Sequence, residues 1–195
     1  MTTTVAIEPV RRTKAVSWPQ DEAFRRFTAG FADWWPRATH SIGGRQTRTI
    51  GFECRVGGQI YEELLDGRCF QWGKVTAWDP PRRVAFTWHP SKDEATAQDV
   101  QVLFHPREQG TEVELTATGW EKLGARGPRE RKGYNIGWGS VLDTYAGRWS
   151  PAIPVFAAVS GIIVTWQKLT GKYQAAIDAA GGRIPGKSLK GGDGQ

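Results

Sequence analysis

The sequence contains few side chains suited to catalysis, and their spacing does not match that of known catalytic sites. Three histidines, His40, His89 and His105, lie far apart, and none has the second histidine or nearby cysteine of a zinc site. Phosphate-binding glycine loops, the Gly-x-Ser-x-Gly turn and the His-Glu-x-x-His motif do not occur. We therefore expect no metal site, no cofactor and no catalytic residues, which favours a binding protein over an enzyme.

The carboxylates give no catalytic signal either. Glu53, Glu62, Glu63, Glu112 and Glu114 are interspersed with apolar residues in segments that read as strands. Such a pattern is typical of strand positions that face solvent. We expect these five side chains to lie on the outside of a sheet, where they would not form a catalytic pair.

The aromatic residues are the strongest positive signal, because ten tryptophans occur in 195 residues. Large rigid rings suit cores, interfaces and pocket walls. Filling of an ordinary core is the competing interpretation for any single ring. The residues expected to line a pocket are Trp34, Trp35, Phe52, Tyr61, Trp72, Lys74, Phe86, Trp88, Trp120, Tyr134 and Trp138. Gln71, Thr87 and Asn135 are further polar candidates for orienting a ligand.

Hydrophobic periodicity predicts the elements that would position these rings. Residues 8–17 form an opening strand, and two short helices follow between residues 19 and 35, separated by Gly30. From residue 48 to 119 about six strands alternate with turns such as Gly57-Gly58 and Asp66-Gly67. Residues 129–149 carry apolar side chains every three or four positions, which predicts a long helix. The fold class is therefore α+β: an antiparallel sheet of about six to seven strands with this helix on its apolar face.

Glycines interrupt the predicted long helix. Gly137 and Gly139 each weaken a helix by roughly 1 kcal/mol relative to alanine. Glycine at such positions can instead allow another element to approach closely.

Charge and cysteine content limit the classes of partner. The net charge is +6, but the basic residues are scattered, and the one dense run, residues 126–132, is interrupted by Glu130. Without a recognition motif this pattern does not indicate nucleic-acid binding. Cys54 and Cys69 are too few for a disulfide framework, and the first residues lack the apolar segment of a secretory signal. We expect a cytoplasmic protein.

The chain after the long helix has a different composition. The apolar segment Pro151–Trp166 is shorter than the ~20 residues that a membrane span needs, so we expect no membrane span. We divide the chain into a ligand-binding domain (1–149), an apolar, helical extension (150–182) and a disordered tail (183–195). The extension could pack on the domain or join two copies into a homodimer.

Five stretches resemble the SRPBCC or START-like superfamily, in the branch related to the activator of Hsp90 ATPase. They are AFRRFTAGFADWWP (23–36), RVGGQIYE (55–62), WGKVTAWDPPRRVAFTW (72–88), GTEVELTATGW (110–120) and GWGSVLDTY (137–145), and the resemblance covers about residues 8–149. Around Trp34, Trp35 and Tyr61 the spacing is also distantly similar to that of calicheamicin self-resistance proteins. The resemblance implies a helix-grip fold with a cavity between sheet and helix. One departure is Ala117, where many relatives carry histidine.

These observations leave three functional hypotheses. The first is binding of a small hydrophobic or aromatic ligand, such as a lipid or metabolite, for carriage, sequestration or antibiotic self-resistance. The second is an enzyme of the START-like cyclase or hydrolase type, which would need a titratable group inside the pocket. The third, by analogy with the Hsp90 activator, is a protein-interaction module.

Overall fold

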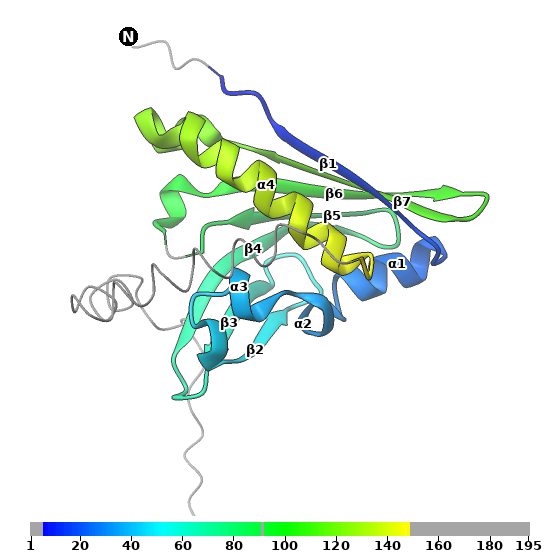
Figure 1. The fold of residues 1–195 in the computed structure, drawn as a ribbon, viewed down its shortest axis with the longest axis horizontal. Helices are drawn as coiled ribbons and strands as arrows, with labels where there is room; N and C mark the ends of the chain where they lie inside the picture. The colour runs from blue at the N-terminus through cyan, green and yellow to red at the C-terminus, as the bar shows by residue number, and fades with distance from the viewer. Residues whose placement is uncertain (1–5, 91, 149–195) are drawn as a thin grey trace, which may run out of the picture.

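A seven-stranded antiparallel sheet forms the body of the computed structural model, which describes residues 6–90 and 92–148. The strand order is β1-β7-β6-β5-β4-β3-β2 (Figure 1). The strands are β1 (Val10–Val16), β2 (Thr47–Phe52), β3 (Gln59–Leu64), β4 (Cys69–Asp79), β5 (Arg83–Trp88), β6 (Gln98–Arg107) and β7 (Gly110–Thr118). The predictions for residues 150–182 and 183–195 lie outside the described residues.

Among the described residues, four α-helices and three short 3₁₀ segments complete the fold. They are α1 (Gln20–Phe27), α2 (Phe31–Trp34), α3 (Arg37–His40), η1 (Gly44–Gln46), η2 (Glu94–Thr96), η3 (Trp120–Arg126) and α4 (Gly127–Tyr145). In Figure 1 the long helix α4 runs across the face of the sheet. The predicted α+β helix-grip fold is confirmed, including the opening strand, the two short helices and the long C-terminal helix.

The first helix begins and buries its face as its sequence predicts. Pro19 precedes it, and Asp21 and Glu22 lie in the first turn, where the helix dipole favours negative charge. Ala23, Phe24 and Phe27 are buried, because positions three and four apart share one face.

Helix α4 buries side chains on the sheet mainly in its C-terminal half. Val141, Leu142 and Tyr145 are almost fully buried, and the Tyr145 hydroxyl donates to the Ala23 carbonyl at 2.7 Å. Near the middle of the helix, the Arg12 guanidinium of β1 donates to the Asn135 carbonyl at 2.8 Å. The middle and the C-terminal end of α4 are thereby fixed to other elements.

Strand β4 does not keep a strict alternation of buried and less buried side chains. Its pairing register shifts near Trp72 on the β3 side and near Thr76 on the β5 side. Each shift inserts an extra residue and changes which face the following side chains take. As a result Phe70, Trp72 and Val75 are buried, while Lys74 is only partly buried.

Glu62 corrects the expectation that the strand carboxylates face solvent. Its side chain is fully buried, and its carboxylate accepts hydrogen bonds from Ile42 N and Gly43 N, both at 2.8 Å, and from Thr47 Oγ1 at 2.6 Å. The segment between α3 and β2 therefore lies over β3. Three donors satisfy the buried charge and hold this segment in place.

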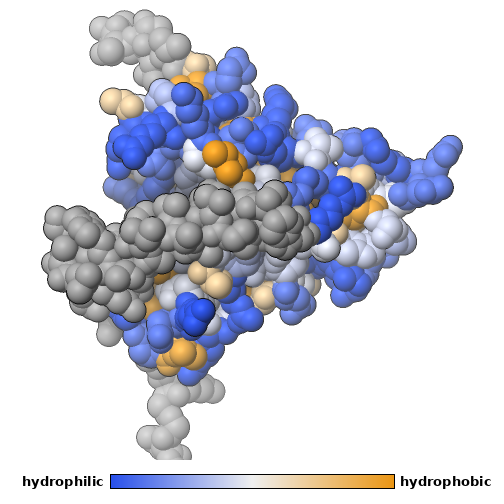
Figure 2. All heavy atoms as spheres, in the orientation of Figure 1, coloured by the Kyte–Doolittle hydropathy of each residue, from blue (hydrophilic) through white to orange (hydrophobic). Residues whose placement is uncertain are grey.

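The surface is mostly polar. Figure 2 shows mainly hydrophilic side chains on the face seen in Figure 1, with a few small apolar areas. Val56, Leu65 and Ile136 are the large hydrophobic residues exposed in the described part of the chain. No helix within residues 6–90 and 92–148 has both the length and the apolar character to cross a bilayer.

Candidate functional site

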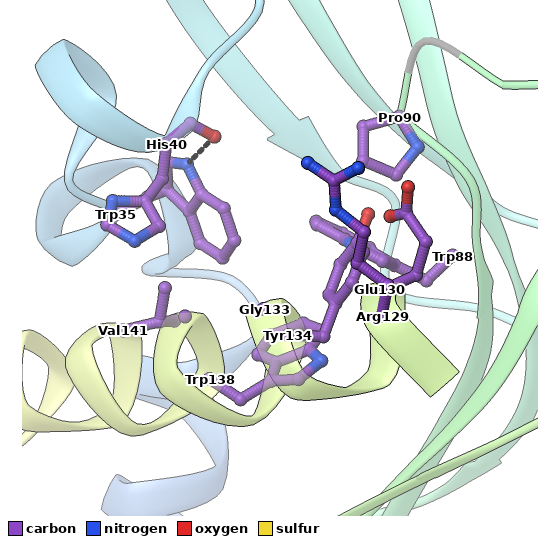
Figure 3. Close-up of a pocket in the computed structure, with 11 residues that line it drawn as sticks. Trp35, His40, Trp88, Pro90, Arg129, Glu130, Gly133, Tyr134, Trp138 and Val141 are labelled. Atoms are coloured by element: carbon purple, nitrogen blue, oxygen red, sulfur yellow. Dashed lines mark hydrogen bonds between the residues drawn. The ribbon is translucent and has the colours of Figure 1, made fainter. Parts of the chain in front are cut away.

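A cavity of about 380 Å³ lies beside α4. Its volume falls within the range of about 300–1,000 Å³ that is usual for ligand pockets. Helix α4 forms one side, while the segment after α2 and the end of β5 form the others (Figure 3). The lining residues are Trp35, His40, Trp88, Pro90, Arg129, Glu130, Gly133, Tyr134, Gly137, Trp138 and Val141.

Two glycines on α4 create the space. The helix residues that line the cavity recur every three or four positions from Glu130 to Val141, so they share one face. Gly133 and Gly137 are on this face, and a Cβ atom added at either would meet no atom within 4 Å. Gly139 differs, because a Cβ there would lie 3.4 Å from the Arg12 side chain. Nothing in the described structure therefore prevents a side chain at 133 or 137.

The aromatic wall is packed and rigid. Trp88 lies between Trp35 and Trp138, with ring centroids 5.5 and 5.2 Å away. Behind them the fully buried Trp72 contacts Trp35 at 5.3 Å and Trp88 at 5.5 Å. The Trp35 indole also donates to the His40 carbonyl at 3.2 Å, which fixes its orientation (Figure 3). Such contacts hold ring planes in place without a ligand.

The end of the cavity near Pro90 is polar. Lys92 forms an ion pair with Glu130 at 2.8 Å, and its ammonium lies 5.0 Å from the Tyr134 ring centroid. Burial raises the pKa of the Tyr134 hydroxyl, the nearby Glu130 carboxylate raises it further, and the Trp88 indole opposes these effects. Tyr134 therefore keeps its proton at neutral pH. Figure 3 shows Arg129 and Glu130 beside Pro90 at this end.

His40 lies across the cavity from this polar end (Figure 3). Burial lowers its pKa from 6.5 to about 4. Its Nδ1 lies 2.7 Å from Thr39 Oγ1. At neutral pH the imidazole is therefore uncharged, and the wall that it forms carries no positive charge.

The structure places four of the eleven predicted site residues around the cavity: Trp35, Trp88, Tyr134 and Trp138. Phe52, Trp72, Phe86 and Trp120 belong to the core or pack against it. Tyr61, on β3, lies over Gly51, and Lys74, on β4, donates its backbone N–H to Thr87 Oγ1 at 3.0 Å. The sequence interpretation did not assign His40, Pro90, Arg129, Glu130, Gly133, Gly137 and Val141 to the site.

The remaining predicted residue, Trp34, lines a second hollow of about 500 Å³ near the C-terminal end of α4. This hollow is more polar, since Arg25, Arg26 and Asp33 also line it, and the Arg26 guanidinium lies 4.5 Å from the Trp18 ring centroid. The described residues include no group of three or more His, Cys, Asp or Glu side chains placed to hold a metal ion. The cavity on α4 is the site best suited to an apolar ligand.

Comparison with known proteins agrees with this fold. A family model described as Activator of Hsp90 ATPase homolog 1-like protein matches residues 17–146. A solved structure of Txn09, an anthrahydroquino-gamma-pyrone synthase complexed with a compound abbreviated SUM, is 31% identical with a TM-score of 0.53. That match covers 73% of this chain and 97% of Txn09. A search of proteins with curated functions finds no match.

Two other solved structures share the fold at lower identity. A Mesorhizobium loti protein is 18% identical with a TM-score of 0.52, covering 72% of this chain and 95% of its own. DynU16, a protein of the dynemicin biosynthetic locus, is 17% identical with a TM-score of 0.52, covering 72% of this chain and 46% of its own. At this identity the two matches show the fold alone.

Proposed function

Since the chain belongs to the family of Activator of Hsp90 ATPase homolog 1-like proteins, we propose that it binds a planar, polycyclic aromatic molecule in the cavity on α4. The observation that carries this proposal is the pair Gly133 and Gly137, which leaves a flat stretch of helix opposite a tryptophan wall. A flat ligand would contact both surfaces. Each Å² of apolar surface that it buries would contribute roughly 25 cal/mol.

The two glycines are hard to explain by folding alone. Each weakens the helix by about 1 kcal/mol relative to alanine, and an alanine Cβ would meet no atom within 4 Å in the described part of the chain. Their conformation is ordinary helix, so no left-handed backbone requires glycine. A ligand that approaches the helix backbone supplies the missing reason.

The relative Txn09 supports the ligand class. Its name describes the synthesis of an anthrahydroquino-gamma-pyrone, which is a fused-ring aromatic compound. Its sequence is 31% identical over 73% of this chain. We therefore favour a fused-ring metabolite over a flexible lipid as the ligand. The role would be carriage or sequestration, and self-resistance to a toxic metabolite is a narrower form of the same proposal.

Titration with a neutral anthraquinone tests this function. Trp35, Trp88 and Trp138 line the cavity, so binding should quench tryptophan fluorescence and raise the melting temperature through mass action. Gly137→Leu should abolish binding, because the leucine side chain would occupy the cavity. The fold should tolerate this change, since no atom of the described residues lies within 4 Å of a Cβ at this position. Gly139→Ala is the matched control and should bind as wild type does. Unchanged binding by a folded Gly137→Leu variant would contradict the proposed site.

Catalysis of ring closure on such a molecule is the second candidate. The observation in its favour is that two titratable side chains, His40 and Tyr134, line the same cavity. The test is to incubate the protein with an anthrahydroquinone that carries an open side chain and to follow products by mass spectrometry. Catalysis would be supported if His40→Ala or Tyr134→Phe no longer forms product but still binds the anthraquinone. Absence of product with the wild-type protein at saturating substrate would count against it.

A further inference from the structure

The polar end of the cavity carries an excess of positive charge. Arg129 and Glu130 both line the cavity, and Lys92 pairs with Glu130 at 2.8 Å. Lys92 neutralises the charge of the Glu130 carboxylate, so Glu130 does not balance the positive charge of Arg129. Among the residues that the structure describes, Arg129 has no ion-pair partner within 4.0 Å. The excess at this end is one positive charge.

The opposite wall does not supply the balancing charge. His40 is uncharged at neutral pH, because burial lowers its pKa to about 4. Trp35, Trp138 and Val141 complete that part of the lining and are apolar. The cavity thus has an apolar body with its charge confined to one end, as Figure 3 shows near Pro90.

The hydrogen-bonding groups at the charged end are mainly donors. A guanidinium donates and cannot accept, and the Tyr134 hydroxyl keeps its proton because burial raises its pKa. Glu130 is the acceptor at this end, and Lys92 already engages it. The groups that remain are complementary to a hydrogen-bond acceptor with negative charge.

We propose that the ligand carries an ionised oxygen substituent, a carboxylate or a phenolate, which binds at the Arg129 end while the fused rings lie against Gly133 and Gly137. This inference rests on the proposed function and adds the charge and the orientation of the ligand. Arg129 would act as a specificity-determining residue, since it distinguishes ionised from neutral ligands of the same shape.

The test compares two ligands that differ in charge, anthraquinone-2-carboxylate and anthraquinone-2-carboxamide, by fluorescence titration of the full-length protein. Because Arg129 is exposed, solvent should weaken this charge-assisted hydrogen bond, and we expect the carboxylate to bind about tenfold more tightly than the carboxamide. Arg129→Gln should remove this preference, because it should weaken binding of the carboxylate far more than binding of the neutral carboxamide. Arg126→Gln, an exposed arginine outside the cavity lining, is the matched control and should keep the preference.

A hydroxyanthraquinone measured below and above the pKa of its phenol tests the phenolate form in the same way. A preference for either ionised probe that Arg129→Gln removes supports the proposal. Equal binding of charged and neutral probes by the wild-type protein overturns it and leaves the proposed function intact. Failure of every probe to bind overturns both, so the two failures are distinguishable.

Discussion

Replacing both cavity glycines by alanine should stabilise the protein and weaken ligand binding. Gly133 and Gly137 are in the interior of α4, where alanine is the better helix former. A Cβ added at either position meets no atom within 4 Å, so no clash opposes the gain. The same two methyl groups would project into the cavity that a ligand is proposed to occupy.

The size of both effects follows from these facts. Each substitution should raise the free energy of unfolding by about 0.8–1 kcal/mol, so the double variant should gain roughly 2 kcal/mol. For a protein of this size that corresponds to a rise in melting temperature of roughly 4–8 °C. Steric intrusion into a packed site costs about 1–3 kcal/mol, which predicts at least about fivefold weaker binding of a neutral anthraquinone.

Urea denaturation and fluorescence titration on the same preparations measure the two quantities. Gly139→Ala is the control, because its Cβ would contact Arg12 and not enter the cavity. It should leave ligand affinity unchanged. If the double variant is less stable than wild type, the glycines are needed for packing and the argument from helix propensity is wrong. If it is more stable but binds equally well, the ligand does not lie on this face of α4.

Three further predictions concern stability and assembly. His40 is protonated near its ordinary pKa of 6.5 in the unfolded chain and near 4 in the folded chain. The free energy of unfolding should therefore fall by up to roughly 2 kcal/mol as pH falls from 6.5 to 4, and urea denaturation of His40→Gln should not show this loss. Glu62→Ala should destabilise the fold by about 3 kcal/mol, since it removes a carboxylate that satisfies three buried donors, whereas Glu62→Gln should cost less in the same urea melts. A chain ending at residue 149 should keep the melting curve and ligand affinity of the full chain. If residues 150–182 join two copies, sedimentation equilibrium should show the truncated chain as a monomer, and a dimeric truncated chain would contradict that role.

The strands were predictable because half-buried sheets impose alternation on the sequence. Val84, Phe86 and Trp88 alternate along β5, and all three are buried. The helix α3 and the 3₁₀ segments η1 and η3 were not predicted, since elements of three to seven residues are too short to show a hydrophobic period. Pro36 lies between α2 and α3 and directly precedes α3.

Glu62 could have been placed correctly from the sequence. Ile60, Glu62 and Leu64 are two residues apart, so they share one face of β3, and all three are buried. The expectation of exposure followed from the pattern of carboxylates interspersed with apolar residues, which is typical of solvent-facing strand positions. What the sequence did not show is the segment at residues 42–47, which supplies the donors from outside the strand.

The cavity itself was harder to predict than the rings around it. Rings that line the cavity, such as Trp88, and rings that fill the core, such as Phe86, occur on the same strand face with the same spacing. Trp88 differs from Phe86 in lying beside the segment after α2 and the helix α4, which line the cavity with it, and no periodic pattern in the sequence shows this. Gly133 is the clearer indication of the cavity, as a helix position where no atom of the described residues lies within 4 Å of an added Cβ.

The two halves of α4 differ in a way that favours a binding site over a packing defect. Toward the C-terminus, Leu142 and Tyr145 are almost fully buried. Toward the N-terminus, the same helix carries glycine where a larger apolar residue would fit and would stabilise the fold. The opposite wall is nevertheless fixed, since Trp35 packs on the buried Trp72 and bonds to the His40 carbonyl. If the proposed ligand binds between this rigid wall and the helix surface, little of the binding free energy should be lost in ordering the site.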